Sequence, residues 1–162
     1  MSVHFSSARQ DWCTPPEVLS LVRQLGPIEL DPCSSGADAV GARIAYTKVD
    51  DGLAIDWRVG GLVYVNPPYG RQIHFWTGKC VEQANMGAEI IALVPARTDT
   101  GWFQECVLFH STAICWWRGR ITFMVDGVKA PAPAPFPSAV VYYGPCVDNF
   151  VSAFSGEGQV TL

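Results

Sequence analysis

The tetrapeptide Asn66-Pro67-Pro68-Tyr69 combines residue types that could hold and polarise an amino group. The two prolines lack backbone N–H donors and keep the chain extended, so their carbonyl groups point away from any helical pattern. Asn66 adds a side-chain amide with both an acceptor and a donor, and Tyr69 adds a flat ring that can stack on another flat group. The pattern predicts a rigid cup that accepts hydrogen bonds from an NH₂ group and stacks on the ring that carries it.

A second strand end carries an acidic side chain next to a proline. Ile28–Asp31 has the composition of a short strand that ends at Pro32, and Leu62–Val65 is a continuous apolar run that ends at Asn66. If both strands are central and parallel, their carboxyl ends lie side by side, and open α/β sheets bind ligands at that edge. We therefore expect Asp31 and Asn66 to belong to one binding site.

Helix signals lie on both sides of these strands. Thr14 can cap a helix, with Glu17 three residues later as a capping box requires, and Gly26-Pro27 ends it. Apolar residues at helical spacing predict further helices over residues 71–86 and from about Thr100 to Phe109.

The remaining apolar runs predict strands that alternate with these helices. They are Ala42–Thr47, Ile90–Val94, Ala113–Trp117, Arg120–Val125 and Ala139–Tyr143. The Ala-Pro run 130–135 predicts a stiff extended loop. Buried strands that alternate with helices indicate an α/β, three-layer domain with a mostly parallel central sheet. We place a flexible N-terminal lead-in at residues 1–10, the domain at 11–148 and a C-terminal tail with little pattern at 149–162.

Composition narrows the class of protein further. The chain has 162 residues, of which 49 % are hydrophobic and 16 % charged, so it can bury a sizeable core. Its net charge of −4 excludes nonspecific binding of nucleic acid through a large positive net charge, but it is compatible with a local basic patch. Six cysteines without a CxxC pair do not suit a zinc site. Because the sequence shows no secretory signal and no apolar run of roughly 18 residues, we expect a cytoplasmic, metal-free protein with reduced thiols.

Several segments taken together resemble the small phage-type DNA N-6-adenine methyltransferases. The Asn-Pro-Pro-Tyr tetrapeptide on its own resembles the catalytic motif of S-adenosylmethionine-dependent amino-methyltransferases in general, including those that act on RNA or on protein glutamine. The full set of segments is more specific and covers roughly residues 11–143. They are Asp11–Pro15, Leu30–Cys33, Asp51–Leu53 with Asp56-Trp57, Val65–Gly70, Val94–Thr100 with Trp102-Phe103, Gly119–Phe123 and Ala134–Ser138.

The resemblance implies an S-adenosylmethionine site around the first strand. Thr14 and Pro15 would hold the methionine end of the cofactor, in a bacterial or phage-infected cell. Asp31 would face the cofactor's amino group, and Pro32-Cys33 directly after it would belong to the same site. Asp56 would approach the adenine of the cofactor, where a carboxylate can accept a hydrogen bond from an NH₂ group.

The resemblance also implies how the target amine is held. Asn66 and the carbonyl of Pro67 would accept its two hydrogens, with Pro68 in the same motif, and Tyr69 would stack on the target base. Two acceptors favour a pyramidal nitrogen whose lone pair points at the sulfonium methyl, whereas a planar aromatic amine is a poor nucleophile. An adenine in DNA must be single-stranded or flipped out of the duplex, which costs a few kcal/mol.

The implied fold is a Rossmann-like methyltransferase fold with an abbreviated cofactor half. The loop Asp31–Gly36 has a single glycine, and the stretch from Asp31 to Asn66 is short for two complete βα units. Two alternatives stay open: the same chemistry on RNA or on a glutamine side chain, and a catalytically idle relative that binds DNA or cofactor. An intact amine-polarising tetrapeptide argues against the idle relative.

Basic side chains in the second half of the chain are candidates for DNA contact. They are Arg97, Arg118, Arg120 and Lys129, which could form the local patch that an acidic protein needs to hold DNA. Ordinary surface charge is the alternative interpretation of all four.

Overall fold

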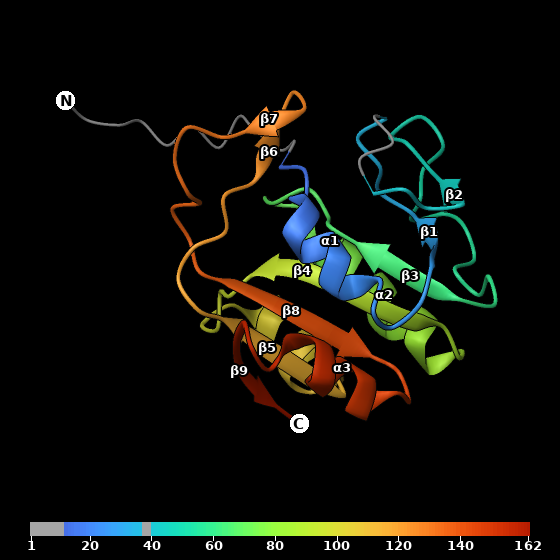
Figure 1. The fold of residues 1–162 in the computed structure, drawn as a ribbon. Coiled ribbons are helices and arrows are strands. Elements are labelled where there is room, and N and C mark those ends of the chain that lie inside the picture. Colours follow the sequence, from blue (N-terminus) through green and yellow to red (C-terminus); the bar gives the residue numbers. More distant parts are fainter. Residues whose placement is uncertain (1–11, 37–39) are drawn as a thin grey trace.

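The computed structural model describes residues 12–36 and 40–162 (Figure 1). The helices are α1 (Pro16–Val22), α2 (Ile73–Asn85), the π-helix η1 (Phe103–Leu108) and α3 (Val147–Phe154). The strands are β1 (Ile28–Asp31), β2 (Ile44–Ala45), β3 (Leu62–Val65), β4 (Glu89–Pro95), β5 (Ala113–Trp117), β6 (Met124–Val125), β7 (Val128–Lys129), β8 (Ser138–Tyr143) and β9 (Gly158–Thr161). The expected lead-in at residues 1–10 lies outside the described residues.

A seven-stranded sheet in the order β2-β1-β3-β4-β8-β5-β9 forms the centre of the molecule. The neighbours β2, β1, β3 and β4 pair in parallel, whereas β8 and β9 run antiparallel to their neighbours. Since β5 is antiparallel to β8, five of the seven strands point the same way. The mostly parallel sheet expected from the sequence is confirmed.

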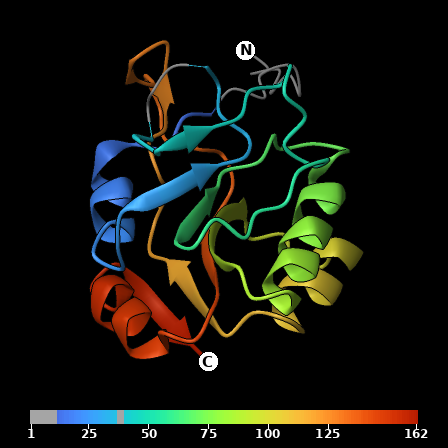
Figure 2. The same ribbon diagram turned by 90° about the vertical axis from the view of Figure 1, so that its right-hand side faces the viewer.

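Helices cover both faces of this sheet and complete three layers. Figure 2 shows α1 and α3 on one side of the strands and α2 and η1 on the other. Alternate residues of β3 point to opposite faces, so Tyr64 packs with α1 and α3 residues while Val63 and Val65 pack with α2 residues. The sheet is thus buried on both faces, which explains the continuous apolar run of β3.

The cofactor half is abbreviated, as the sequence predicted. Between β1 and β3 the described residues form only the two-residue strand β2 and no helix. The chain leaves β1, forms β2 on one side of it, and returns to place β3 on the other side. This reversal is a topological switch point, and it is flanked by the carboxyl ends of two strands: Asp31 is the last residue of β1, and Asn66 directly follows β3.

Two local expectations differ from the structure in this part of the chain. Thr14 does not cap α1: the N-cap position is Pro15, without a side-chain hydrogen bond, because the Thr14 hydroxyl has partners in β3 instead. The run Arg120–Val125 forms strand only at β6, since the backbone carbonyls of Ile121 and Phe123 accept hydrogen bonds from the Ala-Pro run. These two apolar side chains are buried beneath that run, outside the main sheet.

We expected little secondary-structure pattern after residue 148, and this expectation is also wrong. The segment forms most of α3 and the edge strand β9, which pairs with β5. Phe150 and Phe154, one helical turn apart, are fully buried and belong to the core. The helix expected from about Thr100 to Phe109 is present, but its centre is the π-helix η1. In the described part of the chain, no helix is long and apolar enough to cross a membrane.

Candidate functional site

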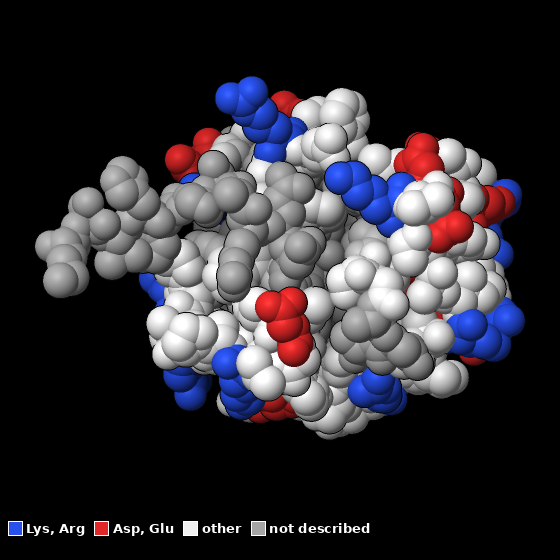
Figure 3. All heavy atoms as spheres, turned by 90° about the horizontal axis from the view of Figure 1, so that it is seen from above, with Lys and Arg blue, Asp and Glu red and all other residues white. Residues whose placement is uncertain are grey.

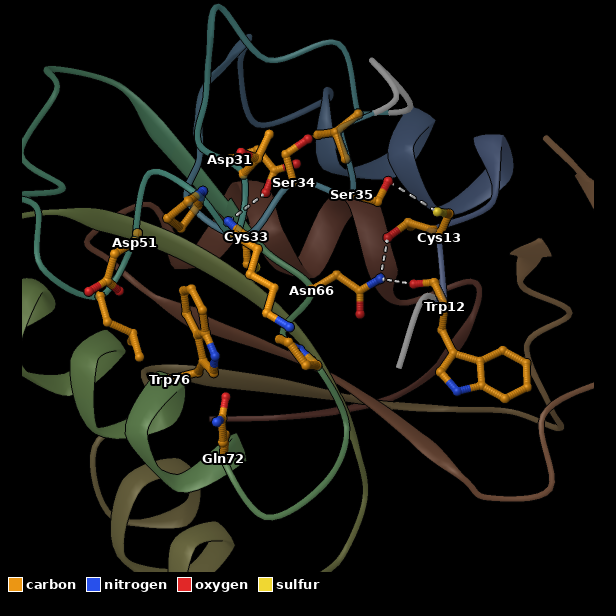
Figure 4. A pocket seen from close by; sticks show the side chains of 18 of the residues that line it. Trp12, Cys13, Asp31, Cys33, Ser34, Ser35, Asp51, Asn66, Gln72 and Trp76 are labelled. Carbon is orange, nitrogen blue, oxygen red and sulfur yellow. Dashed lines mark hydrogen bonds between the residues drawn. The ribbon is translucent and has the colours of Figure 1, made fainter. Parts of the chain in front are cut away.

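A cavity of about 470 Å³ lies at the carboxyl ends of β1 and β3 (Figure 4). Its walls come from the segment before α1, the loop after β1, the loop after β2, and the start of α2. Of the residues predicted for cofactor and catalysis, it is lined by Thr14, Asp31, Pro32, Cys33, Asn66 and Pro68. Its size lies within the range of pockets that hold small molecules.

Asp31 places a buried carboxylate at this cavity. The side chain is 4 % exposed, and among the described residues it forms no ion pair. Burial raises the pKa of Asp31 to about 6, although hydrogen bonds from the Cys33 backbone N–H and the Ser34 hydroxyl act in the opposite direction. A carboxylate that is costly to ionise in the free protein suits a cationic group supplied by a ligand.

The buried Trp57 holds the loop after β2 in place at the cavity through two hydrogen bonds. The indole N–H of Trp57 donates to the Gly52 carbonyl at 2.8 Å, and the Trp57 backbone N–H donates to Oε1 of Gln83 at 2.7 Å. Gly52 passes so close to Pro32 that a Cβ at this position would lie 1.7 Å from the Pro32 carbonyl oxygen. This loop therefore presents Asp51, rather than Asp56, to the cavity.

Asp56 is exposed and forms an ion pair with Arg58. Hydrogen bonds from Arg58 lower the pKa of Asp56 to about 2. The structure does not bring this predicted adenine contact into the lining of the cavity.

Asn66 is oriented by two partners from the segment before α1. Its amide nitrogen donates to the backbone carbonyl of Trp12 at 2.5 Å and to Oγ1 of Thr14 at 3.2 Å. The amide oxygen is buried and has no hydrogen-bond partner among the described residues. In Figure 4 this oxygen points away from Trp12. The side chain therefore offers an unused acceptor at the edge of the cavity.

Tyr69 belongs to an aromatic cluster rather than to the cavity lining. Its ring packs edge-on against Phe123 and Phe136, with centroids 6.1 and 5.4 Å away, and its hydroxyl donates to the Leu93 carbonyl at 3.1 Å. Trp12 packs against the same two phenylalanines. The residue is half-buried, and both its ring and its hydroxyl are held by neighbouring groups.

Trp76 supplies the cavity with a donor that the sequence did not single out. Its ring is 8 % exposed and stacks on Trp57, with centroids 6.3 Å apart. Its indole N–H has no acceptor among the described residues. The cavity thus combines a buried carboxylate, an unused N–H and, at its edge, an unused amide oxygen. This set fits a ligand with a cationic amine and ring or hydroxyl acceptors.

The predicted arginines lie at the same edge of the sheet. Arg97 follows β4 and Arg118 follows β5, and these strands point the same way as β1 and β3. Arg97, Arg118 and Arg120 are exposed and form no ion pair within the described ranges. Lys129 is paired with Glu17 at 2.9 Å. In the view from above, Lys and Arg side chains are spread around the margin and interspersed with Asp and Glu (Figure 3).

Sequence reasoning missed four residues that build this site: Trp12, Tyr64, Trp57 and Trp76. Tyr64 had a signal, since it lies two residues before Asn66 on a strand and must point to the same face. The tryptophans had none, because a core tryptophan and a site tryptophan look alike in sequence. Within the described residues, no group of three or more His, Cys, Asp or Glu side chains could hold a metal ion.

Fold and site together define a Rossmann-like methyltransferase fold with a ligand cavity at its switch point. A sequence profile of the DNA N-6-adenine-methyltransferase (Dam) family matches residues 2–146, and the chain belongs to that family. It is also 30 % identical over 122 residues to the DNA N-6-adenine-methyltransferase of Escherichia phage T1. That match covers 75 % of this chain and 50 % of the phage protein, so the chain spans about half the length of the curated relative. The resemblance inferred from the motifs is confirmed.

Proposed function

We propose that this chain transfers a methyl group from S-adenosylmethionine to the N6 amino group of adenine in DNA. The observation that carries the proposal is the Asn66 amide, whose nitrogen is occupied by protein acceptors while its buried oxygen has no partner among the described residues. An unused acceptor on a residue that lines the cavity is what the hydrogen of an amino group needs. Membership of the Dam family supports DNA adenine as the bearer of that amino group.

The cavity residues would hold the methyl donor. Asp31 would accept hydrogen bonds from its ammonium group, and Trp76 would donate its indole N–H to an acceptor on the donor molecule. Pro32, Cys33 and Asp51 also line the cavity. Bound S-adenosylmethionine would supply an electrophilic methyl group on a sulfonium.

The tetrapeptide would act on the target amine. The Asn66 oxygen and the Pro67 carbonyl would accept its two hydrogens, which favours a pyramidal nitrogen with its lone pair available for attack. Tyr69 would stack on the base, since its hydroxyl is anchored on β4 and its ring edges on two phenylalanines. The exposed Arg97, Arg118 and Arg120 would contact DNA phosphates from the same edge of the sheet.

A labelled-donor assay tests the proposal. The chain is given S-adenosylmethionine with labelled methyl, and unmethylated DNA, RNA and glutamine-containing peptide in parallel. We expect label in DNA as N6-methyladenine, and a loss of roughly 100-fold or more in kcat for Asn66→Ala, because a group that stabilises the reacting centre is removed. Asn149→Ala, an exposed asparagine on α3, is the matched control.

Calorimetry separates binding from turnover. Asn66→Ala should bind S-adenosylmethionine as the wild type does, because Asp31 and Trp76 are intact. Label confined to RNA or peptide would refute the DNA substrate. The absence of any heat of binding with the wild type would favour a catalytically idle protein.

A further inference from the structure

We propose that Thr14, Tyr64 and the backbone carbonyl of Trp12 form a positioning network that fixes which end of the Asn66 amide faces the target amine. The inference rests on the proposed function, in which Asn66 accepts a hydrogen from that amine. It gives Thr14 a role in orienting the catalytic side chain rather than one of holding the methyl donor through its hydroxyl.

The first step is the direction of the hydrogen bond between Asn66 and the Trp12 carbonyl. A backbone carbonyl can only accept, so the Asn66 atom 2.5 Å from the Trp12 oxygen has to be the NH₂ nitrogen. With this assignment, the two amide hydrogens have two protein acceptors, the Trp12 carbonyl and the Thr14 hydroxyl oxygen. The oxygen of Asn66 is then the atom left for a ligand.

The second step is how the Thr14 hydroxyl is itself held. Thr14 is 3 % exposed, and its Oγ1 lies 2.7 Å from the hydroxyl of Tyr64, which is fully buried. One hydroxyl oxygen has two lone pairs and one hydrogen, so it can accept from Asn66 and still bond to Tyr64. Burial excludes water as a substitute partner, so the position of the Thr14 hydroxyl depends on Tyr64.

The third step is the placement of the network in the fold. Tyr64 lies on β3 and Asn66 directly follows that strand, while Trp12 and Thr14 come from the segment that precedes α1. The backbone of Cys13 in this segment pairs with that of Met124 in β6 through an isolated antiparallel β-bridge. The Trp12 ring packs on the phenylalanines that hold Tyr69. One short segment therefore sets both the amide orientation and the stacking platform.

The consequence of losing the network is specific. Without acceptors for its NH₂ group, the Asn66 amide is free to rotate and to present a donor to the target amine, which is itself a donor through its hydrogens. The methyl-donor cavity keeps Asp31 and Trp76, so donor binding is preserved. The network therefore predicts a loss in kcat without a matching change in donor affinity.

Three substitutions test this. Thr14→Val removes the hydroxyl at nearly constant volume, Thr14→Ser keeps it, and Tyr64→Phe removes only the phenol oxygen. We expect Thr14→Val to lower kcat about 10-fold, Tyr64→Phe to lower it less, and Thr14→Ser to restore most of the rate. The dissociation constant for S-adenosylmethionine should stay within about twofold throughout. Matched controls are Thr77→Val and Tyr143→Phe, buried hydroxyls bonded elsewhere in the core.

A second readout does not depend on activity. The side-chain NH₂ resonances of Asn66 in an ¹⁵N-labelled sample should be protected from solvent exchange in the wild type and in Thr77→Val. In Thr14→Val they should move toward the free-amide position and exchange faster. The network would be overturned if Thr14→Val left kcat unchanged, whether or not the dissociation constant of the donor rose.

The two readouts distinguish this inference from the proposed function. If the wild type methylates no substrate but the Asn66 resonances respond to Thr14→Val as stated, the proposed function fails and the network stands. If the wild type methylates adenine but the resonances and kcat do not respond to Thr14→Val, the proposed function stands and the network is refuted.

Discussion

Replacing Asp31 by asparagine should change stability and donor binding in opposite directions. The carboxyl is 4 % exposed, and burial raises its pKa from 3.8 to about 6, against hydrogen bonds from Cys33 and Ser34. The difference between these two pKa values corresponds to about 3 kcal/mol of folding free energy at 1.36 kcal/mol per pH unit.

The direction of the pH effect on stability follows from proton binding by Asp31 in the folded and unfolded states. Because the pKa of Asp31 is higher in the folded protein than in the unfolded chain, the folded state holds the proton more tightly. The stabilisation is complete below the unfolded pKa of 3.8 and is lost as the pH rises through about 6. Wild-type protein should thus lose up to about 3 kcal/mol of stability from this group between pH 4 and pH 7. Asp31→Asn has no proton to lose and should lack this part of the pH dependence.

Donor affinity should show the reverse trend. An ammonium group binds the ionised carboxylate, so the affinity of the wild type for S-adenosylmethionine should rise as the pH increases through about 6. At pH 7.5 the loss of one charge-assisted hydrogen bond in Asp31→Asn should weaken binding about 10- to 100-fold. The variant should therefore be as stable as the wild type or more stable at pH 7.5, and a poorer binder.

Urea unfolding under reducing conditions at pH 4.5, 5.5 and 7.5, with calorimetric titration of the donor at the last two values, measures both effects. Asp148→Asn, an exposed carboxylate on α3, should keep the wild-type pH dependence. Parallel stability curves for wild type and Asp31→Asn would refute the raised pKa of Asp31, and equal donor affinity at pH 7.5 would refute the assignment of Asp31 to the ammonium of the donor.

Other substitutions probe the cavity and the DNA-facing edge. Trp76→Phe removes an N–H without a protein acceptor in the described residues and shortens a buried ring that stacks on Trp57, so it should lower the free energy of unfolding and raise the donor dissociation constant about 3- to 10-fold by calorimetry. Gly52→Ala sets a methyl group against the Pro32 carbonyl and should cost about 1–3 kcal/mol in urea unfolding, whereas Gly78→Ala, with open space around it, should stabilise α2 by about 0.5–1 kcal/mol. Arg118→Ala should raise the KM for duplex DNA and reduce the slope of log KM against log salt by about one, with donor affinity unchanged; an unaltered slope would remove it from the phosphate contacts.

The sequence by itself determined the strands at whose carboxyl ends Asp31 and Asn66 lie. β1, β3 and β5 have the bounds that the sequence predicted. β3 and β5 are uninterrupted apolar runs, which buried strands leave in a sequence, whereas in β1 apolar residues alternate with Glu29 and Asp31 until Pro32 ends the strand. The parallel placement of Asp31 and Asn66 followed from the same reasoning. Family membership was also readable, since the motifs occur in a fixed order along the chain.

Only the tertiary structure decided which partner each polar group takes. Thr14 satisfied every local rule for a helix cap, yet its hydroxyl bonds to Tyr64 and Asn66, residues 50 and 52 positions away in the sequence. Asp51 rather than Asp56 faces the cavity because Trp57 fastens the loop through Gly52 and Gln83. Local spacing records which conformations a segment favours, whereas a buried donor or acceptor takes whatever partner the packing of distant segments brings within reach. For this reason strands and motifs could be inferred from the sequence, while the orientation of the Asn66 amide could not.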